Sequence, residues 1–124
     1  MKIWHKLAAA LGIVSSVAYA QGGRPPEHAV IVHFRYGSTD LSPLFKLEDA
    51  LESALAATGA GQYDGNEVAI DGRDGYLYLY GPDADRLYEA VAAILKREAF
   101  MRGARVKKRY GPPEDGVKES EFQL

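Results

Sequence analysis

The chain contains no cysteine, which excludes disulfide bonds, thiolate metal sites and lipid attachment at an N-terminal cysteine. Its three histidines do not cluster as a zinc site requires. The apolar or small-residue run from Leu7 to Val17 covers only eleven residues, whereas a helix needs about 20 to span a bilayer. Without cross-links or an anchor, the folded part must be stabilised by its hydrophobic core.

Residues 1–20 are typical of a cleavable secretory signal peptide. Lys2 and Lys6 accompany the apolar run, and no acidic residue occurs before Glu27. Ala18, Tyr19 and Ala20 then provide the small-x-small pattern that signal peptidase accepts. We therefore expect cleavage before Gln21 and a periplasmic or secreted product with no membrane span.

The predicted mature chain is acidic. Removing residues 1–20 takes away two basic and no acidic side chains, so the net charge changes from −2 to −4. That balance does not favour a nucleic-acid partner. We expect residues 21–27 to form a flexible leader, residues 28–111 to form one domain, and residues 112–124 to be a loosely ordered tail with a short strand near Phe122.

Alternation of apolar and polar residues predicts the strands. The first strand covers residues 28–36. Strands over 67–72 and 75–80 follow, joined by a hairpin in which Gly72 and Gly75 tolerate positive φ angles. A charged edge strand is expected over 104–110.

Helical spacing and capping residues predict two helices. Leucines recur at helical spacing after Ser42, which we expect to cap a helix over 43–58 that stops at Gly59. Asp83 caps the second helix, whose buried stripe begins at Leu87 and which ends at Gly103.

The resulting order is strand, helix, strand, strand, helix, strand. This order predicts an α+β fold of the ferredoxin-like βαββαβ type, with a four-stranded antiparallel sheet and both helices on one face. We also expect the first and third strands to run parallel at the centre. The segments Tyr36–Gly37 and Tyr80–Gly81 would then leave the sheet at the same edge.

The sheet face without helices is the candidate recognition surface. If Leu77 and Leu79 point at the helices, the residues alternating with them line the other face. Aromatic and arginine-rich surfaces are typical of recognition. The predicted binding residues are Tyr76, Tyr78, Tyr80, His33, Arg35, Arg105, Lys107 and Arg109. The opposite phase would place Ile31, Leu77 and Leu79 on this face and favour a dimer or partner interface.

The leading hypothesis is therefore an exported, non-catalytic domain that binds a protein partner or self-associates, with an inhibitor or immunity-like factor as one version. The competing hypothesis is a small hydrolase or anion-binding protein that uses His33 and the helix N-termini after Tyr36–Gly37 and Tyr80–Gly81. The acidic residues between 64 and 74 lack calcium-loop spacing. We predict no catalytic residue, metal or cofactor.

Three motifs occur together: DGNE at 64–67, YGPDAD at 80–85 and RYGPP at 109–113. With their flanking segments, 35–55, 61–91 and 100–116, they resemble a family of small exported bacterial proteins with no established activity. The resemblance implies the ferredoxin-like arrangement and brings no catalytic residues.

Overall fold

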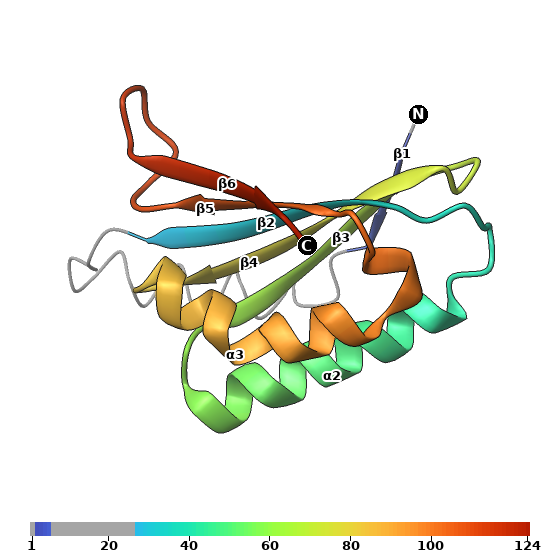
Figure 1. The fold of residues 1–124 in the computed structure, drawn as a ribbon, viewed down its shortest axis with the longest axis horizontal. Coiled ribbons are helices and arrows are strands. Elements are labelled where there is room, and N and C mark those ends of the chain that lie inside the picture. The colour runs from blue at the N-terminus through green and yellow to red at the C-terminus, as the bar shows by residue number, and fades with distance from the viewer. Residues whose placement is uncertain (1, 6–26) are drawn as a thin grey trace.

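Two helices and one antiparallel sheet make up residues 2–5 and 27–124, the part of the chain that the computed structural model describes (Figure 1). The sheet has the strand order β1-β3-β4-β2-β5-β6. The elements are β1 (Lys2–His5), β2 (His28–Arg35), α2 (Ser42–Thr58), β3 (Gln62–Ala69), β4 (Asp74–Gly81), α3 (Ala84–Arg97), the short 3₁₀ helix η1 (Ala99–Met101), β5 (Arg105–Arg109) and β6 (Glu119–Gln123).

The α+β class and both helices are confirmed, but the sheet is wider than the predicted four strands. Part of the tail forms β6 against β5, and Val106 pairs with Phe122. On the other side β1 pairs with β3, so that Lys2 lies opposite Ala69. Because β1 falls inside the predicted signal peptide, cleavage would leave β3 at the edge of the sheet. Residues 6–26, which include the predicted cleavage site and most of the leader, lie outside the described residues.

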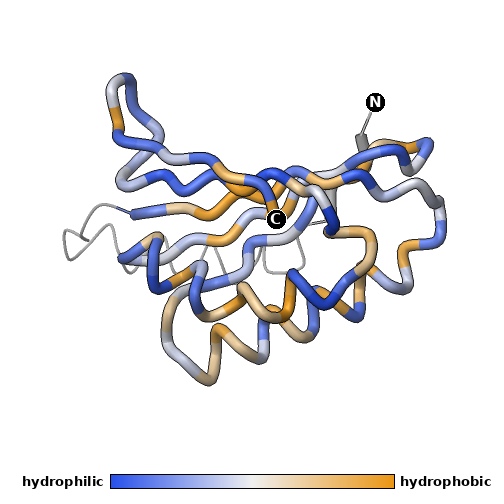
Figure 2. Tube along the Cα trace, viewed as in Figure 1, coloured by the Kyte–Doolittle hydropathy of each residue, from blue (hydrophilic) through white to orange (hydrophobic). Residues whose placement is uncertain are grey.

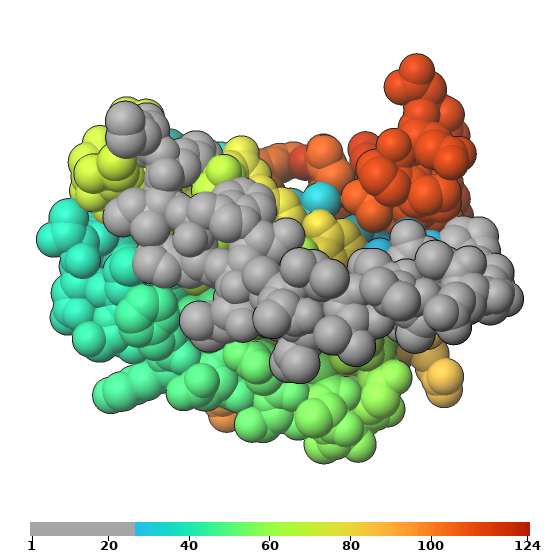
Figure 3. Space-filling model, turned by 180° about the vertical axis from the view of Figure 1, so that it is seen from behind, coloured from blue at the N-terminus to red at the C-terminus, as the bar shows by residue number. Residues whose placement is uncertain are grey.

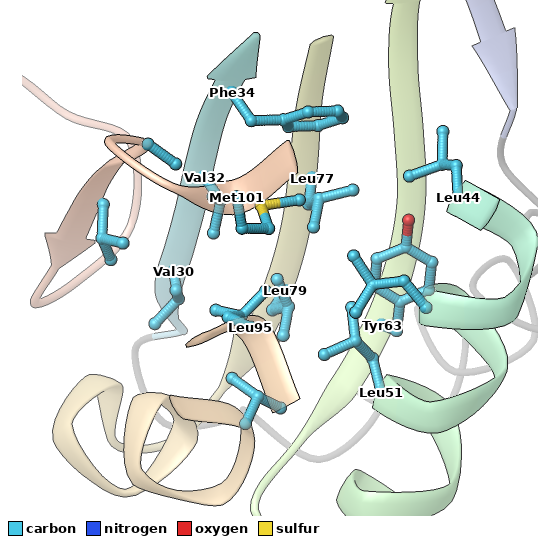
Figure 4. Packing of buried hydrophobic residues seen from close by; sticks show 14 of the residues in the cluster. Val30, Val32, Phe34, Leu44, Leu51, Tyr63, Leu77, Leu79, Leu95 and Met101 are labelled. Atoms are coloured by element: carbon cyan, nitrogen blue, oxygen red, sulfur yellow. The ribbon is translucent and has the colours of Figure 1, made fainter. Parts of the chain in front are cut away.

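The core lies between the sheet and the helix layer. Val30, Val32 and Phe34 of β2 and Leu77 and Leu79 of β4 are at most 1% exposed, and Figure 4 shows their side chains on the side of the sheet that faces α2. The hydrophobic colour along β2 marks the centre of this layer (Figure 2). The period-two pattern of the sequence therefore separated the two faces of the sheet, and the structure decides which of them is buried.

Helix α2 is stabilised by the leucine stripe that the sequence predicted. Leu44, Leu47, Leu51 and Leu55 are buried, and the helix stops at Gly59 with a φ of 68°. The predicted cap at Ser42 is wrong, because Ser42 is already helical and its amide donates to Asp40 Oδ1 at 3.0 Å. A capping serine would accept from the amides two or three residues after it, and no side-chain hydrogen bond of that kind caps α2.

Helix α3 begins as predicted and ends earlier. The Asp83 carboxylate accepts from the amides of Asp85 and Arg86 at 2.9 and 3.3 Å, which confirms the cap. The helix ends at Arg97, not at Gly103, because η1 takes up the next turn of chain. Gly103, with a φ of 79°, instead lies in the turn into β5.

The expected parallel pairing of the first and third strands is wrong. In the antiparallel ladder of β2 and β4, Arg35 lies opposite Asp74 and His28 lies opposite Gly81. The reason is topological: α2 returns the chain so that β3 runs in the direction of β2, and the hairpin then reverses β4. Tyr36–Gly37 and Tyr80–Gly81 therefore leave the sheet at opposite edges.

In the described part of the chain, no helix combines the length and the apolar character needed to cross a membrane.

Candidate functional site

We call the sheet face opposite α2 and α3 the recognition face. Among residues 27–124, both α-helices pack on the other side of the sheet (Figure 1). The phase in which Leu77 and Leu79 point at the helices is the observed one, since both are 0% exposed. The structure thus places all eight predicted binding residues on or at the end of this face. The alternative is wrong for Leu77 and Leu79, although Ile31, opposite Tyr78, does lie on this face.

Aromatic rings form a column along β4. His33 of β2 lies opposite Tyr76, and their rings stack with centroids 4.3 Å apart and an interplanar angle of 8°. Tyr76 continues the column to Tyr78, at 6.1 Å and 17°. The column forms because alternate side chains of β4 point to the same face and because the pairing of β2 with β4 places His33 opposite Tyr76 on that face.

His33 also binds a carboxylate. Its Nε2 lies 2.9 Å from Asp74 Oδ2, and the side chains of His33 and Asp74 are 42% and 25% exposed. Glu67 lies on the other side of β4 from His33, opposite Tyr76. The cleft beside His33 is lined by His33, Phe34, Arg35, Arg102, Gly103, Arg105 and Gln123. This lining contains no serine or cysteine, so the His33–Asp74 pair has no nucleophile to activate there.

The hydroxyl of Tyr78 makes the second polar contact of the column. It donates to Glu67 Oε1 at 3.4 Å. Partial burial and the Glu67 carboxylate raise the pKa of Tyr78 to about 12, since both disfavour the phenolate. Tyr78 is therefore a neutral hydrogen-bonding side chain at physiological pH.

The basic residues of β5 are less available than the sequence suggested. Lys107 and Arg105 face Glu119 and Glu121 of β6, at 3.9 and 3.4 Å. Arg109 is only 9% exposed, and its Nε donates to the carbonyl of Gly111 at 2.7 Å. Arg109 therefore bonds the start of the β5–β6 turn, which stands out from the body of the molecule (Figure 3), and its role as a contact residue stays a prediction.

Tyr80 belongs to the same end of the face. The Arg109 guanidinium lies 6.0 Å from its ring centre, and burial followed by the charge of Asp64 raises the pKa of Tyr80. Tyr80 therefore packs on Arg109, while Tyr76 and Tyr78 form the aromatic centre of the face.

Arginines gather at the other end of the face, around a cleft of about 420 Å³. Arg35 comes from the end of β2, Arg105 from β5, and Arg102 from the turn after η1. Sequence reasoning missed Arg102, because its place in the cleft depends on where α3 ends. The only available signal was its position one residue before Gly103.

A buried polar cluster was also missed. Glu48 of α2 is 0% exposed, and its Oε2 accepts from Tyr63 Oη at 2.5 Å and from Asn66 Nδ2 at 2.7 Å. Tyr63 and Asn66 are three residues apart in β3, yet both face the helices because the register shifts between Tyr63 and Gly65. Figure 4 shows Tyr63 directed towards α2. Burial and the Glu48 carboxylate raise the pKa of Tyr63.

The sequence did carry a signal for this cluster. Glu48 follows Leu44 by four residues and precedes Leu51 by three, so it lies on the buried leucine stripe of α2. An acidic residue at such a position indicates a buried partner, although not which one. The cluster links α2 to β3 by hydrogen bonds. Because Glu48 and Asn66 are 0% exposed, we infer that the cluster stabilises the fold.

The competing anion-site hypothesis loses its geometric basis. The starts of α2 and α3 follow strand ends on opposite edges, and the Asp83 carboxylate already occupies the first amides of α3. A groove of about 540 Å³ does adjoin this helix start, but its lining carries two acidic side chains, Asp83 and Glu89, against one basic side chain, Arg86. Among the described residues, no group of three or more His, Cys, Asp or Glu side chains could hold a metal ion.

Comparison with protein-family models, curated proteins and solved structures returned no match for this chain. The resemblance to a family of small exported bacterial proteins therefore stays a prediction.

Proposed function

We propose that this protein is an exported, non-catalytic binding domain that recognises a protein partner through the recognition face. The observation that carries the proposal is the stacked column of His33, Tyr76 and Tyr78 on the face opposite both helices. An inhibitor or immunity-like factor is one version of such a domain.

The aromatic column favours recognition on energetic grounds. Tyrosine offers a large contact area with few rotatable bonds, so ordering it on binding costs little entropy. Here the rings of His33 and Tyr76 already stack, and Asp74 holds the His33 imidazole. A partner would meet a pre-ordered surface, which lowers the entropic cost of association further.

The proposal includes a ferredoxin-like classification of the domain. The order β2, α2, β3, β4, α3, β5 and the spatial order β3-β4-β2-β5 support it. In this arrangement one sheet face is committed to the helices and the other is left for contacts. Strands β1 and β6 extend the sheet without covering either face.

The proposal is tested with a double variant of the column, Tyr76→Ser and Tyr78→Ser. The matched control is Phe45→Ser, which removes an aromatic side chain that is 40% exposed on the helix layer. A partner captured by cross-linking from the exported fraction is identified, purified and titrated against all three proteins. We expect the column variant to bind at least about tenfold more weakly and the control to bind as the parent does. Equal weakening by both variants would show that the partner does not use this face.

A further inference from the structure

We propose that the arginine cleft, the cavity lined by Arg35, Arg102 and Arg105 beside His33, binds carboxylate side chains of an acidic segment of the protein partner. This inference rests on the proposed function and names the partner's chemistry. The cleft adjoins the aromatic column through His33, which belongs to both.

Three separate segments bring the positive charge together. Arg35 is the last residue of β2, Arg102 lies between η1 and β5, and Arg105 begins β5. All three are exposed, and they line one concave volume of about 420 Å³. That volume is in the range that accommodates a ligand of several functional groups, about 300–1,000 Å³. It is therefore large enough for more than one acidic side chain.

Two of the three guanidinium groups have no carboxylate partner within residues 27–124, namely those of Arg35 and Arg102. Arg105 does have one, since its Nε lies 3.4 Å from Glu121 Oε1, but the two side chains are 58% and 45% exposed. An exposed pair at that distance is weak, so Arg105 can be shared with an incoming anion. Like charges held around one concave surface are stabilised when an anion enters between them.

Strand β6 shows which ligand suits this region. Glu119 and Glu121 alternate along it and face Lys107 and Arg105 of the neighbouring strand. An extended acidic segment thus already pairs with two of the four basic residues of β5, Lys107 and Arg105, within this chain. Within residues 27–124, Arg35 and Arg102 form no ion pair with a glutamate of β6, although Gln123 of that strand lines the same cleft. Guanidinium groups match carboxylates in a bidentate geometry.

The experiment uses the full chain labelled with ¹⁵N, and the signals are the Nε–Hε groups of the arginines. The probes are an acetylated and amidated tetra-glutamate peptide, the corresponding tetra-glutamine peptide, and inorganic phosphate. We expect tetra-glutamate to shift the signals of Arg35 and Arg102 saturably and more weakly at high salt. Tetra-glutamine should leave them unchanged. Tighter binding of phosphate than of tetra-glutamate would overturn the assignment to an acidic segment, and so would the absence of any shift.

The variants separate this inference from the proposed function. Arg35→Gln with Arg102→Gln removes two guanidinium groups and should weaken tetra-glutamate binding by at least about tenfold, a change of about 1.4 kcal/mol. Arg86→Gln removes the same charge from the start of α3 and should leave binding unchanged; equal weakening by Arg86→Gln would overturn the site. If the double variant still binds the captured partner as the parent does, the cleft inference fails while the recognition face stands. If the column variant also binds it unchanged, the proposed function fails.

Discussion

Replacing the buried Glu48 with methionine should destabilise the domain by about 2 to 6 kcal/mol. Methionine has nearly the same length, so the substitution leaves little cavity, but it offers no oxygen acceptor. The Tyr63 hydroxyl and the Asn66 amide, which donate to Glu48 Oε2 at 2.5 and 2.7 Å, would both lose that acceptor. Each buried donor left without a partner costs about 1–3 kcal/mol.

The measurements are equilibrium unfolding in urea and thermal unfolding, both followed by circular dichroism. For a domain of this size about 1 kcal/mol shifts the melting temperature by about 4–8 °C, so we expect a fall of at least about 8 °C. The matched control is Glu52→Met, which removes a carboxylate from the exposed side of the same helix and should change stability by less than about 0.5 kcal/mol. A Glu48→Met protein as stable as the parent would refute the reasoning, because the free-energy cost of burying the carboxylate would then equal the free energy gained from its hydrogen bonds.

Three further outcomes are expected. Glu67→Gln should lower the pKa of Tyr78 from about 12 towards 10, seen by ultraviolet titration of the phenolate; only part of the shift should disappear because burial is its larger cause. Since this folded pKa exceeds the ordinary one, the stability linked to Tyr78 is complete below pH 10 and lost as the pH rises through 12. Gly72→Ala should destabilise more than Gly59→Ala in thermal melts, because both need a positive φ but only at Gly72 would the new Cβ overlap a backbone carbonyl. Mass spectrometry of the exported protein should show an N-terminus at Gln21, and an intact N-terminus in that fraction would contradict the predicted cleavage.

Local patterns predicted most of the fold. Alternation located β2, β4 and β5, and the leucine spacing located α2 to within one residue. The strand predicted over 67–72 is wrong in its bounds, because β3 runs from Gln62 to Ala69 and its register shift interrupts the alternation. The Asp83 cap was also found, because a cap bonds only amides two or three residues away. A helix, strand or cap could thus be predicted from the sequence where the residues that cause it are close together in the chain.

The candidate site was predicted less completely because its contacts join distant residues. His33 and Asp74 are 41 residues apart, so no spacing rule could pair them. Arg102 entered the arginine cleft only because α3 ends at Arg97 and η1 turns the chain back. The β3 register shift, which brings Tyr63 and Asn66 to one side, likewise depends on pairing with β4.

The two faces of the sheet have separate physical roles. The helix side holds the apolar core and the Glu48 cluster, so changes there should act on unfolding. The recognition face carries the aromatic column and ends at the arginine cleft, and its ion pairs are partly exposed and therefore weak. We expect Tyr76 and Arg102 to contribute little to the free energy of unfolding. A change of Arg102 that leaves urea unfolding untouched but weakens partner binding would separate the two roles, and a change of Glu48 should do the reverse.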